Sequence, residues 1–141
     1  VSRLRDLELH LEITESAYAE NVDQLIRVVD TFRERGFLIE LDDFGAGYSS
    51  LNMLANLPID VLKMDMKFMQ SVTRDEKSRR MVQIIMEIAD FLQVPVVAEG
   101  VENEEQYRLL KDMGCQYIQG YYFSRPLPAA EFEELIIKEL K

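Results

Sequence analysis

Short apolar runs alternate along this chain with longer segments in which apolar residues recur every three to four positions. The short runs predict β-strands and the periodic segments predict amphipathic helices. The run from Val94 to Ala98 is almost wholly apolar, which is typical of a parallel strand covered on both faces. The pattern predicts strands over 7–13, 37–41, 61–64, 94–98 and 117–120, and helices that begin near Val22, Ser50, Met81, Asn103 and Pro128.

This repeating order of strand and helix predicts an α/β fold with a parallel sheet. An open doubly wound sheet and part of a (β/α)8 barrel both fit the order. In a barrel the carboxyl ends of the strands meet at one mouth, whereas an open sheet spreads them along a line. We favour the barrel because a polar residue lies at or near the carboxyl end of each of the five strands, namely Glu12, Asp42 with Asp43, Lys63, Glu99 and Gln119.

The segment from Leu38 to Leu51 carries the most distinctive chemistry, because an apolar run ends there in two adjacent aspartates and a glycine-rich turn. Neighbouring carboxylates repel each other unless a cation or a shared proton neutralises them. Taken alone, the segment fits an ordinary solvated loop. The polar residues at the ends of the other strands favour a binding or catalytic site over a solvated loop.

The charge, cysteine content and apolar runs of the chain limit what it can bind and where it can reside. The chain has 141 residues and a net charge of -10, from 26 acidic and 16 basic side chains, which argues against binding polymeric nucleic acid. A small anionic substrate stays possible if metal ions reverse the local field. The single cysteine, Cys115, excludes an internal disulfide, and no apolar run approaches the length of a membrane span. We therefore expect one cytoplasmic domain whose residues do not contact a membrane, and allow for a parent protein that is membrane-anchored through upstream segments.

The candidate residues form a set of oxygen donors. Such a set suits Mg2+, Mn2+ or Ca2+ better than zinc. Adjacent aspartates could each bind one of two ions, or one could bridge both, as in two-metal phosphoryl chemistry. Lys63 could bind a phosphate oxygen or orient the attacking water, and Glu99 could be a metal ligand or a general base. Any one of these residues fits an ion pair equally well, but together they favour catalysis.

Five segments, in order along the chain, resemble the signatures of the EAL domain family. That family consists of bacterial cyclic di-GMP phosphodiesterases with a modified TIM (β/α)8 barrel, which open the cyclic dinucleotide to linear pGpG with Mg2+ or Mn2+. The matching segments are Glu12-Ile13-Thr14-Glu15, the run from Asp42 to Leu51, Lys63-Met64-Asp65, the run from Ala98 to Glu102, and Gln119-Gly120-Tyr121.

The resemblance implies a role for each of the central residues. Glu12, Asp42 and Asp43 are the expected metal ligands, and Lys63 is expected beside the nucleophilic water. Glu99 corresponds to the catalytic glutamate, for which the ligand and base roles both stay open.

Other residues are implied to support the site. Gln119 corresponds to a polar group of the active site, and Glu15 and Glu102 correspond to glutamates that hold the loop after the paired aspartates. Thr14 and Asp65 are the weaker candidates for contacts with substrate.

The chain also departs from the family pattern. Ala46 stands where many members have threonine, and the Glu-Ala-Leu signature and the asparagine motif after it, each with a metal ligand, are absent. The resemblance thus implies that residues 1–141 form the C-terminal portion of an EAL domain, with an incomplete two-metal site and no activity alone. A non-catalytic cyclic di-GMP receptor and a regulatory or assembly module are the alternatives. We also expect a homodimer, formed at exposed strand edges, and allow for an upstream sensory or GGDEF-type domain in the parent protein.

Overall fold

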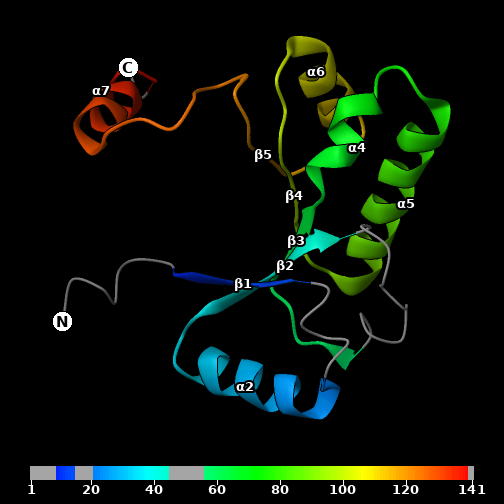
Figure 1. The fold of residues 1–141 in the computed structure, drawn as a ribbon, viewed down its shortest axis with the longest axis vertical. Coiled ribbons are helices and arrows are strands. Elements are labelled where there is room, and N and C mark those ends of the chain that lie inside the picture. Colours follow the sequence, from blue (N-terminus) through cyan, green and yellow to red (C-terminus); the bar gives the residue numbers. More distant parts are fainter. Residues whose placement is uncertain (1–8, 15–20, 45–55, 140–141) are drawn as a thin grey trace.

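The computed structural model describes residues 9–14, 21–44 and 56–139. Within them, five parallel strands form one sheet with the consecutive order β1-β2-β3-β4-β5 (Figure 1). A barrel adds each strand beside the previous one, whereas a doubly wound sheet reverses its strand order. The consecutive order therefore confirms the α/β fold class and favours a barrel segment. The strands are β1 (His10–Thr14), β2 (Leu38–Phe44), β3 (Val61–Met64), β4 (Val96–Ala98) and β5 (Tyr117–Ile118).

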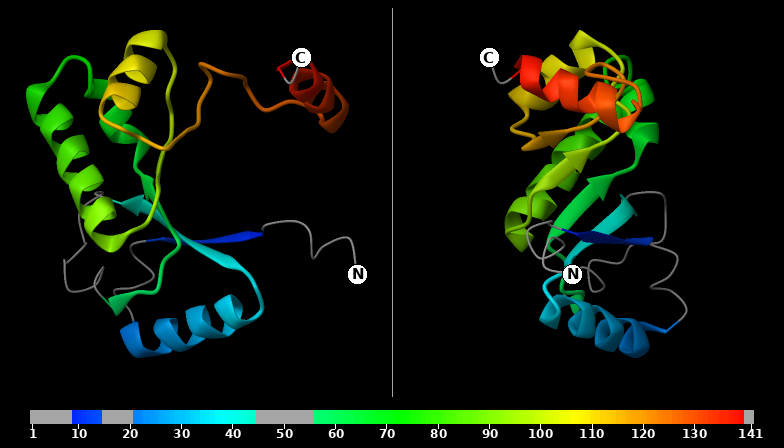
Figure 2. Two further views of the ribbon diagram at one scale, coloured as in Figure 1. Left: turned by 180° about the vertical axis from the view of Figure 1, so that it is seen from behind. Right: turned by 90° about the vertical axis from the view of Figure 1, so that its left-hand side faces the viewer.

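The described helices lie mainly along one side of the twisted sheet. Helix α2 runs beside β2, and α5 and α6 cover β3 and β4, while α7 stands apart at the end of an extended segment (Figure 2). None of the helices in the described parts is long and apolar enough to cross a membrane. The helices are α2 (Val22–Glu34), α4 (Met66–Ser71), α5 (Glu76–Leu92), α6 (Glu104–Asp112) and α7 (Ala129–Glu139).

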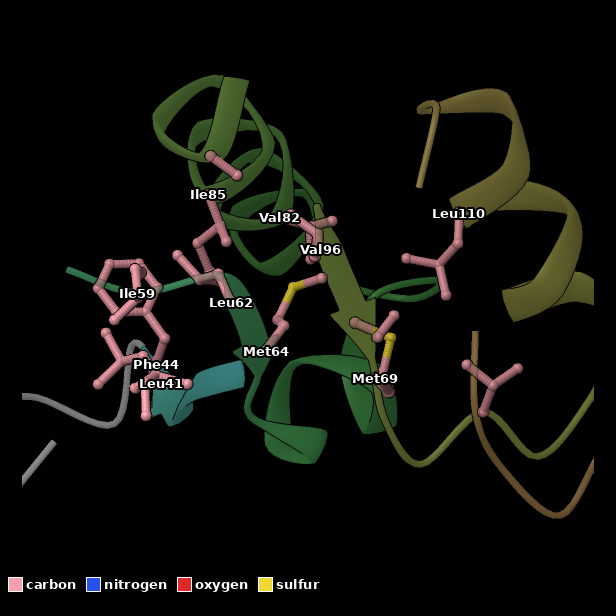
Figure 3. Close-up of a cluster of buried hydrophobic side chains, with 14 of the residues drawn as sticks. Leu41, Phe44, Ile59, Leu62, Met64, Met69, Val82, Ile85, Val96 and Leu110 are labelled. Atoms are coloured by element: carbon pink, nitrogen blue, oxygen red, sulfur yellow. The ribbon is translucent and has the colours of Figure 1, made fainter. Parts of the chain in front are cut away.

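The hydrophobic core fills the space between the sheet and helices α2, α4, α5 and α6 (Figure 3). Leu62 and Val96 point outward from neighbouring strands, and Val82 and Ile85 face them from α5. Each of the four side chains is at most 2% exposed. Burial of one such side chain contributes about 1.5–3 kcal/mol, so this layer fixes the positions of the strands that carry the polar residues.

The opposite face of the sheet carries the polar side chains of the strands. Successive side chains of a strand point to opposite faces, so residues two apart share a face. Leu41 is fully buried in the core, whereas Glu40 and Asp42 belong to the other face of β2. Lys63 lies between the core residues Leu62 and Met64 in the same way. The polar face is therefore where the candidate site forms.

Several predicted elements match the structure closely. Strand β3 has the predicted limits, α2 begins at Val22, and Asn103 forms a capping box with Gln106 at the start of α6. Strand β2 continues to Phe44, three residues beyond the prediction, because the paired aspartates belong to the strand. Strands β4 and β5 are shorter than predicted, and most of the helix expected over 50–57 lies outside the described residues.

Two differences concern helices. Helix α5 begins five residues before Met81, because Asp75 caps a polar first turn with bonds from the backbone N–H groups of Lys77 and Ser78. Helix α4 was not predicted, since six residues are too few to show a helical period.

The final helix has the predicted position, but its apolar residues stay uncovered. Phe132 is 52% exposed and Ile136 is 42% exposed among the described residues. The prediction of an apolar face is correct, and the described part of the chain does not bury it.

Candidate active site

Lys63 lies at the centre of a group of carboxylates from neighbouring strands. Its Nζ atom is 2.9 Å from Oε1 of Glu99, 3.7 Å from Oδ1 of Asp42 and 3.9 Å from Oε2 of Glu40. It also donates a hydrogen bond to Glu12 of β1. The lysine side chain is only 8% exposed. The structure thus brings Glu12, Asp42, Lys63 and Glu99 to one place, as the barrel interpretation predicts for strand ends.

The charge of Lys63 is stabilised by these partners. Burial works against the ammonium ion, but the hydrogen bonds with Glu12 and Glu99 and the charges of Glu99 and Asp42 outweigh that effect. The pKa of Lys63 is therefore raised well above its ordinary value. One firmly protonated ammonium group faces four carboxyl groups, so the site carries an excess of acidic groups over its single cation.

The paired aspartates interrupt the regular pairing of β2. The register between β2 and β3 shifts between Leu41 and Phe44, and Asp43 has a φ of +57°. Asp43 donates its backbone N–H to Oδ1 of Asp42 over 2.9 Å. Few residues other than glycine adopt a positive φ, and aspartate is one that tolerates it. This bulge gives the two carboxylates different directions from one strand end.

Asp43 has an exposed carboxyl group in an acidic environment. Partial desolvation, followed by the neighbouring charges of Asp42 and Asp65, raises the pKa of Asp43. A raised carboxyl pKa beside other carboxylates indicates a place where a cation would be favourable.

The segment after β4 carries Glu99 and is held tightly on both sides. Gly100 has a φ of +74°, and a Cβ atom there would lie 2.8 Å from Cβ of Met66. A Cβ atom on Gly120 would lie 2.0 Å from the carbonyl oxygen of Val101. Both glycines are therefore required by close approach, and they fix the direction in which Glu99 leaves the strand.

Gln119 and Glu102 lie beside Glu99 rather than against Lys63. The backbone of Gln119 continues the pairing with β4, because its N–H donates to Ala98 over 2.9 Å and its carbonyl accepts from Val101 over 3.2 Å. Glu99, Glu102 and Gln119 line one cavity of about 220 Å3. The structure therefore groups these three predicted residues, and it leaves their roles as predictions.

The remaining predicted residues have separate positions. Thr14 ends β1 opposite Asp42 in the strand register. Asp65 is buried and caps α4, accepting from the N–H of Lys67 over 2.8 Å. Glu15 lies outside the described residues, so its role in holding the loop after the paired aspartates stays a prediction.

Two residues of the site were missed from the sequence. Glu40 is hydrogen-bonded to Nδ1 of His10 and faces Lys63 with its other carboxylate oxygen. His10 and Glu40 lie two positions before Glu12 and Asp42 and so share their face of the sheet. That two-residue spacing is the signal that could have identified them.

The donor chemistry of the site fits a hard divalent cation. Carboxylate oxygens are the ligands that Mg2+ and Mn2+ prefer. Over residues 9–14, 21–44 and 56–139 no three acidic, histidine or cysteine side chains are arranged as a ready metal cage. The carboxylates face the Lys63 ammonium group instead. The type of ligand thus suits these ions, and in the structure Lys63 supplies the positive charge that faces the carboxylates.

Comparison with known proteins decides the family. The family model described as "EAL domain" matches residues 2–126. The chain belongs to the EAL domain family.

Relatives of known name support the same assignment. The EAL chain is 44% identical over 128 residues to the cyclic di-GMP phosphodiesterase NbdA of Pseudomonas aeruginosa, covering 91% of this chain and 16% of that protein. It is 38% identical over 133 residues to the cyclic di-GMP phosphodiesterase PdeR of Escherichia coli, covering 94% of this chain and 20% of that protein. The EAL chain thus spans a small part of the length of these relatives.

Solved EAL structures share the fold. The structure of the PaMucR phosphodiesterase in complex with c-di-GMP superposes with a TM-score of 0.84 at 37% identity, covering 88% of this chain and 50% of that one. The manganese and cyclic di-GMP complex of Klebsiella pneumoniae BlrP1 gives a TM-score of 0.77 at 33% identity, covering 83% of this chain and 30% of that one. The five strands and their helices therefore match a portion of EAL barrel structures.

Proposed function

We propose that this chain supplies part of the active site of a metal-dependent phosphodiesterase that hydrolyses cyclic di-GMP to linear pGpG. The observation that carries the proposal is the meeting of Lys63 with Glu12, Asp42 and Glu99, which come from four different strand ends of an EAL chain. Related proteins bear the names of cyclic di-GMP phosphodiesterases, and solved relatives are described in complex with the dinucleotide. The chain spans half of the PaMucR chain, so turnover is proposed for the protein that contains these residues.

Each central side chain has a proposed part in the chemistry. Glu12, Asp42 and Asp43 would hold Mg2+ or Mn2+, which polarise phosphoryl oxygens and lower the pKa of bound water. The Lys63 ammonium group would orient the attacking water or a phosphate oxygen, since its raised pKa keeps it a hydrogen-bond donor. Glu99 would take the proton of that water or complete the ligand set.

The supporting residues are proposed around this centre. Gln119 would add a polar contact beside Glu99, with which it shares a cavity. Glu15 and Glu102 would hold the loop that follows the paired aspartates. Thr14 and Asp65 are proposed as contacts for substrate.

We also propose that the isolated chain binds these ions weakly and turns over little or no substrate. Lys63 is paired with Glu12 and Glu99, so a metal ion would have to compete with its ammonium group for these carboxylates. In the described sheet β1 and β5 are the two edge strands, so pairing with a second copy is the proposed form in solution. Light scattering over a concentration series tests this, and a cooperative monomer at every concentration would contradict it.

The proposed function is tested by product analysis on the parent protein. Release of pGpG from cyclic di-GMP is expected with Mg2+ or Mn2+, and Glu99→Gln and Asp42→Asn should each lower kcat by about two orders of magnitude or more. Glu76→Gln, at a side chain that is 87% exposed on α5, is the matched control and should keep wild-type turnover. Near wild-type turnover in both site variants would refute the mechanism, whereas tight binding of cyclic di-GMP without turnover would favour the receptor alternative.

A further inference from the structure

Gln106 has a buried side-chain amide in which both the oxygen and the nitrogen form hydrogen bonds. The residue is 6% exposed. Its Oε1 atom accepts from the backbone N–H of Glu102 over 2.8 Å and from that of Asn103 over 3.3 Å. Its Nε2 atom donates to the carbonyl oxygen of Met69 over 2.6 Å. Only this orientation of the amide satisfies two donors on one side and an acceptor on the other.

Helix capping explains only one of these bonds. In a capping box the side chain at the third helical position returns to the backbone of the cap residue, here Asn103. The bonds to Glu102 and to Met69 lie beyond that motif. The bond to Met69 joins residues 37 positions apart, from α6 to α4. The amide therefore acts as a tether between two separate elements.

The tether connects the two segments that carry the central ion pair. Glu99 belongs to the segment that ends at Glu102, and Lys63 belongs to β3, the strand that leads into α4. Gly100 adds a second contact between the same elements, because it lies against Met66 at the start of α4. One buried amide and one close packing contact thus set the position of the Glu99 segment relative to the Lys63 strand.

We propose that Gln106 is a positioning residue that sets the geometry of the Glu99–Lys63 pair for the hydrolysis of cyclic di-GMP. The inference rests on the proposed function for its catalytic consequence. A displacement of about 1 Å in a reacting group can lower a rate by about 100-fold, so loss of the tether affects kcat although Gln106 does not contact substrate.

The test uses a pair of variants that separate the tether from the helix cap. Gln106→Glu keeps the acceptor for Glu102 and Asn103 but removes the donor to Met69. Asn103→Ala removes the cap acceptor for the N–H of Gln106 and leaves the side-chain tether in place. We expect kcat for pGpG formation to fall about 10- to 100-fold in Gln106→Glu, with KM within about threefold of wild type. Asn103→Ala should stay within about twofold in both constants.

A second measurement reports on the ion pair without any turnover. The 15N-labelled ammonium group of Lys63 gives a nuclear magnetic resonance signal that depends on its partners. In Gln106→Glu this signal should move toward its position in Glu99→Gln, and in Asn103→Ala it should keep its wild-type position. Gln106→Met loses all three side-chain hydrogen bonds at similar volume and should show the same change in the Lys63 signal. This variant replaces Gln106→Glu in the test if the charged side chain prevents folding.

The two proposals fail in different ways. A wild-type parent protein without turnover would refute the proposed function, and the Lys63 signal would still decide the positioning role. A folded Gln106 variant with wild-type kcat and an unmoved Lys63 signal would overturn the positioning role alone.

Discussion

Nζ of Lys63 lies 2.9 Å from Oε1 of Glu99, so the carboxyl ends of two neighbouring strands are joined by one short ion pair. The same ammonium group also contacts Glu12 and approaches Asp42. Lysine therefore serves as the internal counter-charge of an acidic site. The balance of charge at the site, and with it part of the stability of the fold, depends on this one side chain.

Replacement of Lys63 by methionine should destabilise the chain. Removal of the lysine leaves the facing carboxylates without their counter-charge, and such a loss costs about 3–5 kcal/mol in a fully buried pair. Glu12 is 53% exposed and is therefore screened by water, so we expect a loss of about 2 kcal/mol in the free energy of unfolding at pH 7. Urea denaturation measures this change. Lys138→Met is the control, because that side chain is exposed on α7, away from the cluster, and the change in stability should be less than about 0.5 kcal/mol.

The contribution of Lys63 should also depend on pH with a defined sign. Its folded pKa lies above the ordinary lysine value of 10.5, so the folded state holds this proton more tightly than the unfolded state does. The stabilisation is complete below the unfolded pKa and is lost as the pH rises through the folded pKa. The difference in unfolding free energy between wild type and Lys63→Met should thus be constant from about pH 8 to pH 10 and shrink above that. A difference that grows in alkali would contradict the ion-pair assignment.

Asp43→Asn should stabilise the fold while lowering turnover. The folded pKa of Asp43 is raised, so its ionised form disfavours the folded state as the pH rises through that pKa. Because the carboxyl group is exposed, the gain should be only a few tenths of a kcal/mol at pH 7 and should vanish below about pH 3. Asn also tolerates a positive φ, whereas Asp43→Ala should lose about 1 kcal/mol through backbone strain. Thermal unfolding across pH separates the two effects, and equal stability of the two variants would argue against the strain.

Gly120→Ala should be far more disruptive than a substitution at a glycine with free space. The added Cβ atom would lie 2.0 Å from the carbonyl oxygen of Val101, so the backbone must move and the segment that carries Glu99 moves with it. We expect a loss of more than about 2 kcal/mol in unfolding free energy. Gly114→Ala is the control: its φ is +83° but nothing lies within 4 Å, so only about 1 kcal/mol of strain is expected. Similar losses in both variants would show that the close approach to Val101 does not matter.

The sequence predicted the sheet because buried parallel strands and their helices leave a clear apolar period. It also predicted Glu12, Asp42, Lys63 and Glu99, since polar residues at the ends of apolar strands stand out. It missed Glu40, because a charged residue inside a strand has the same pattern as a solvent-facing position.

Other features depend on contacts between distant parts of the chain. The capping bonds between Gln106 and Asn103 follow a local pattern, but the bond from Gln106 to Met69 spans 37 residues and has no local pattern. The positive φ of Asp43 likewise accompanies the register shift between β2 and β3, and the sequence of the paired aspartates does not indicate that shift. Pairing of distant elements therefore explains what local sequence could not predict.

The ion cluster at Lys63 also has a consequence for how the chain folds. Its contact with Glu12 joins residues 51 positions apart, so it requires β1, β2 and β3 to be assembled first. Contacts of such long sequence separation carry a high entropic cost of loop closure and tend to form late. Substitutions in the cluster should therefore change the unfolding rate much more than the folding rate. The ion cluster of the site would then form late in folding, after the strands that carry its residues have paired.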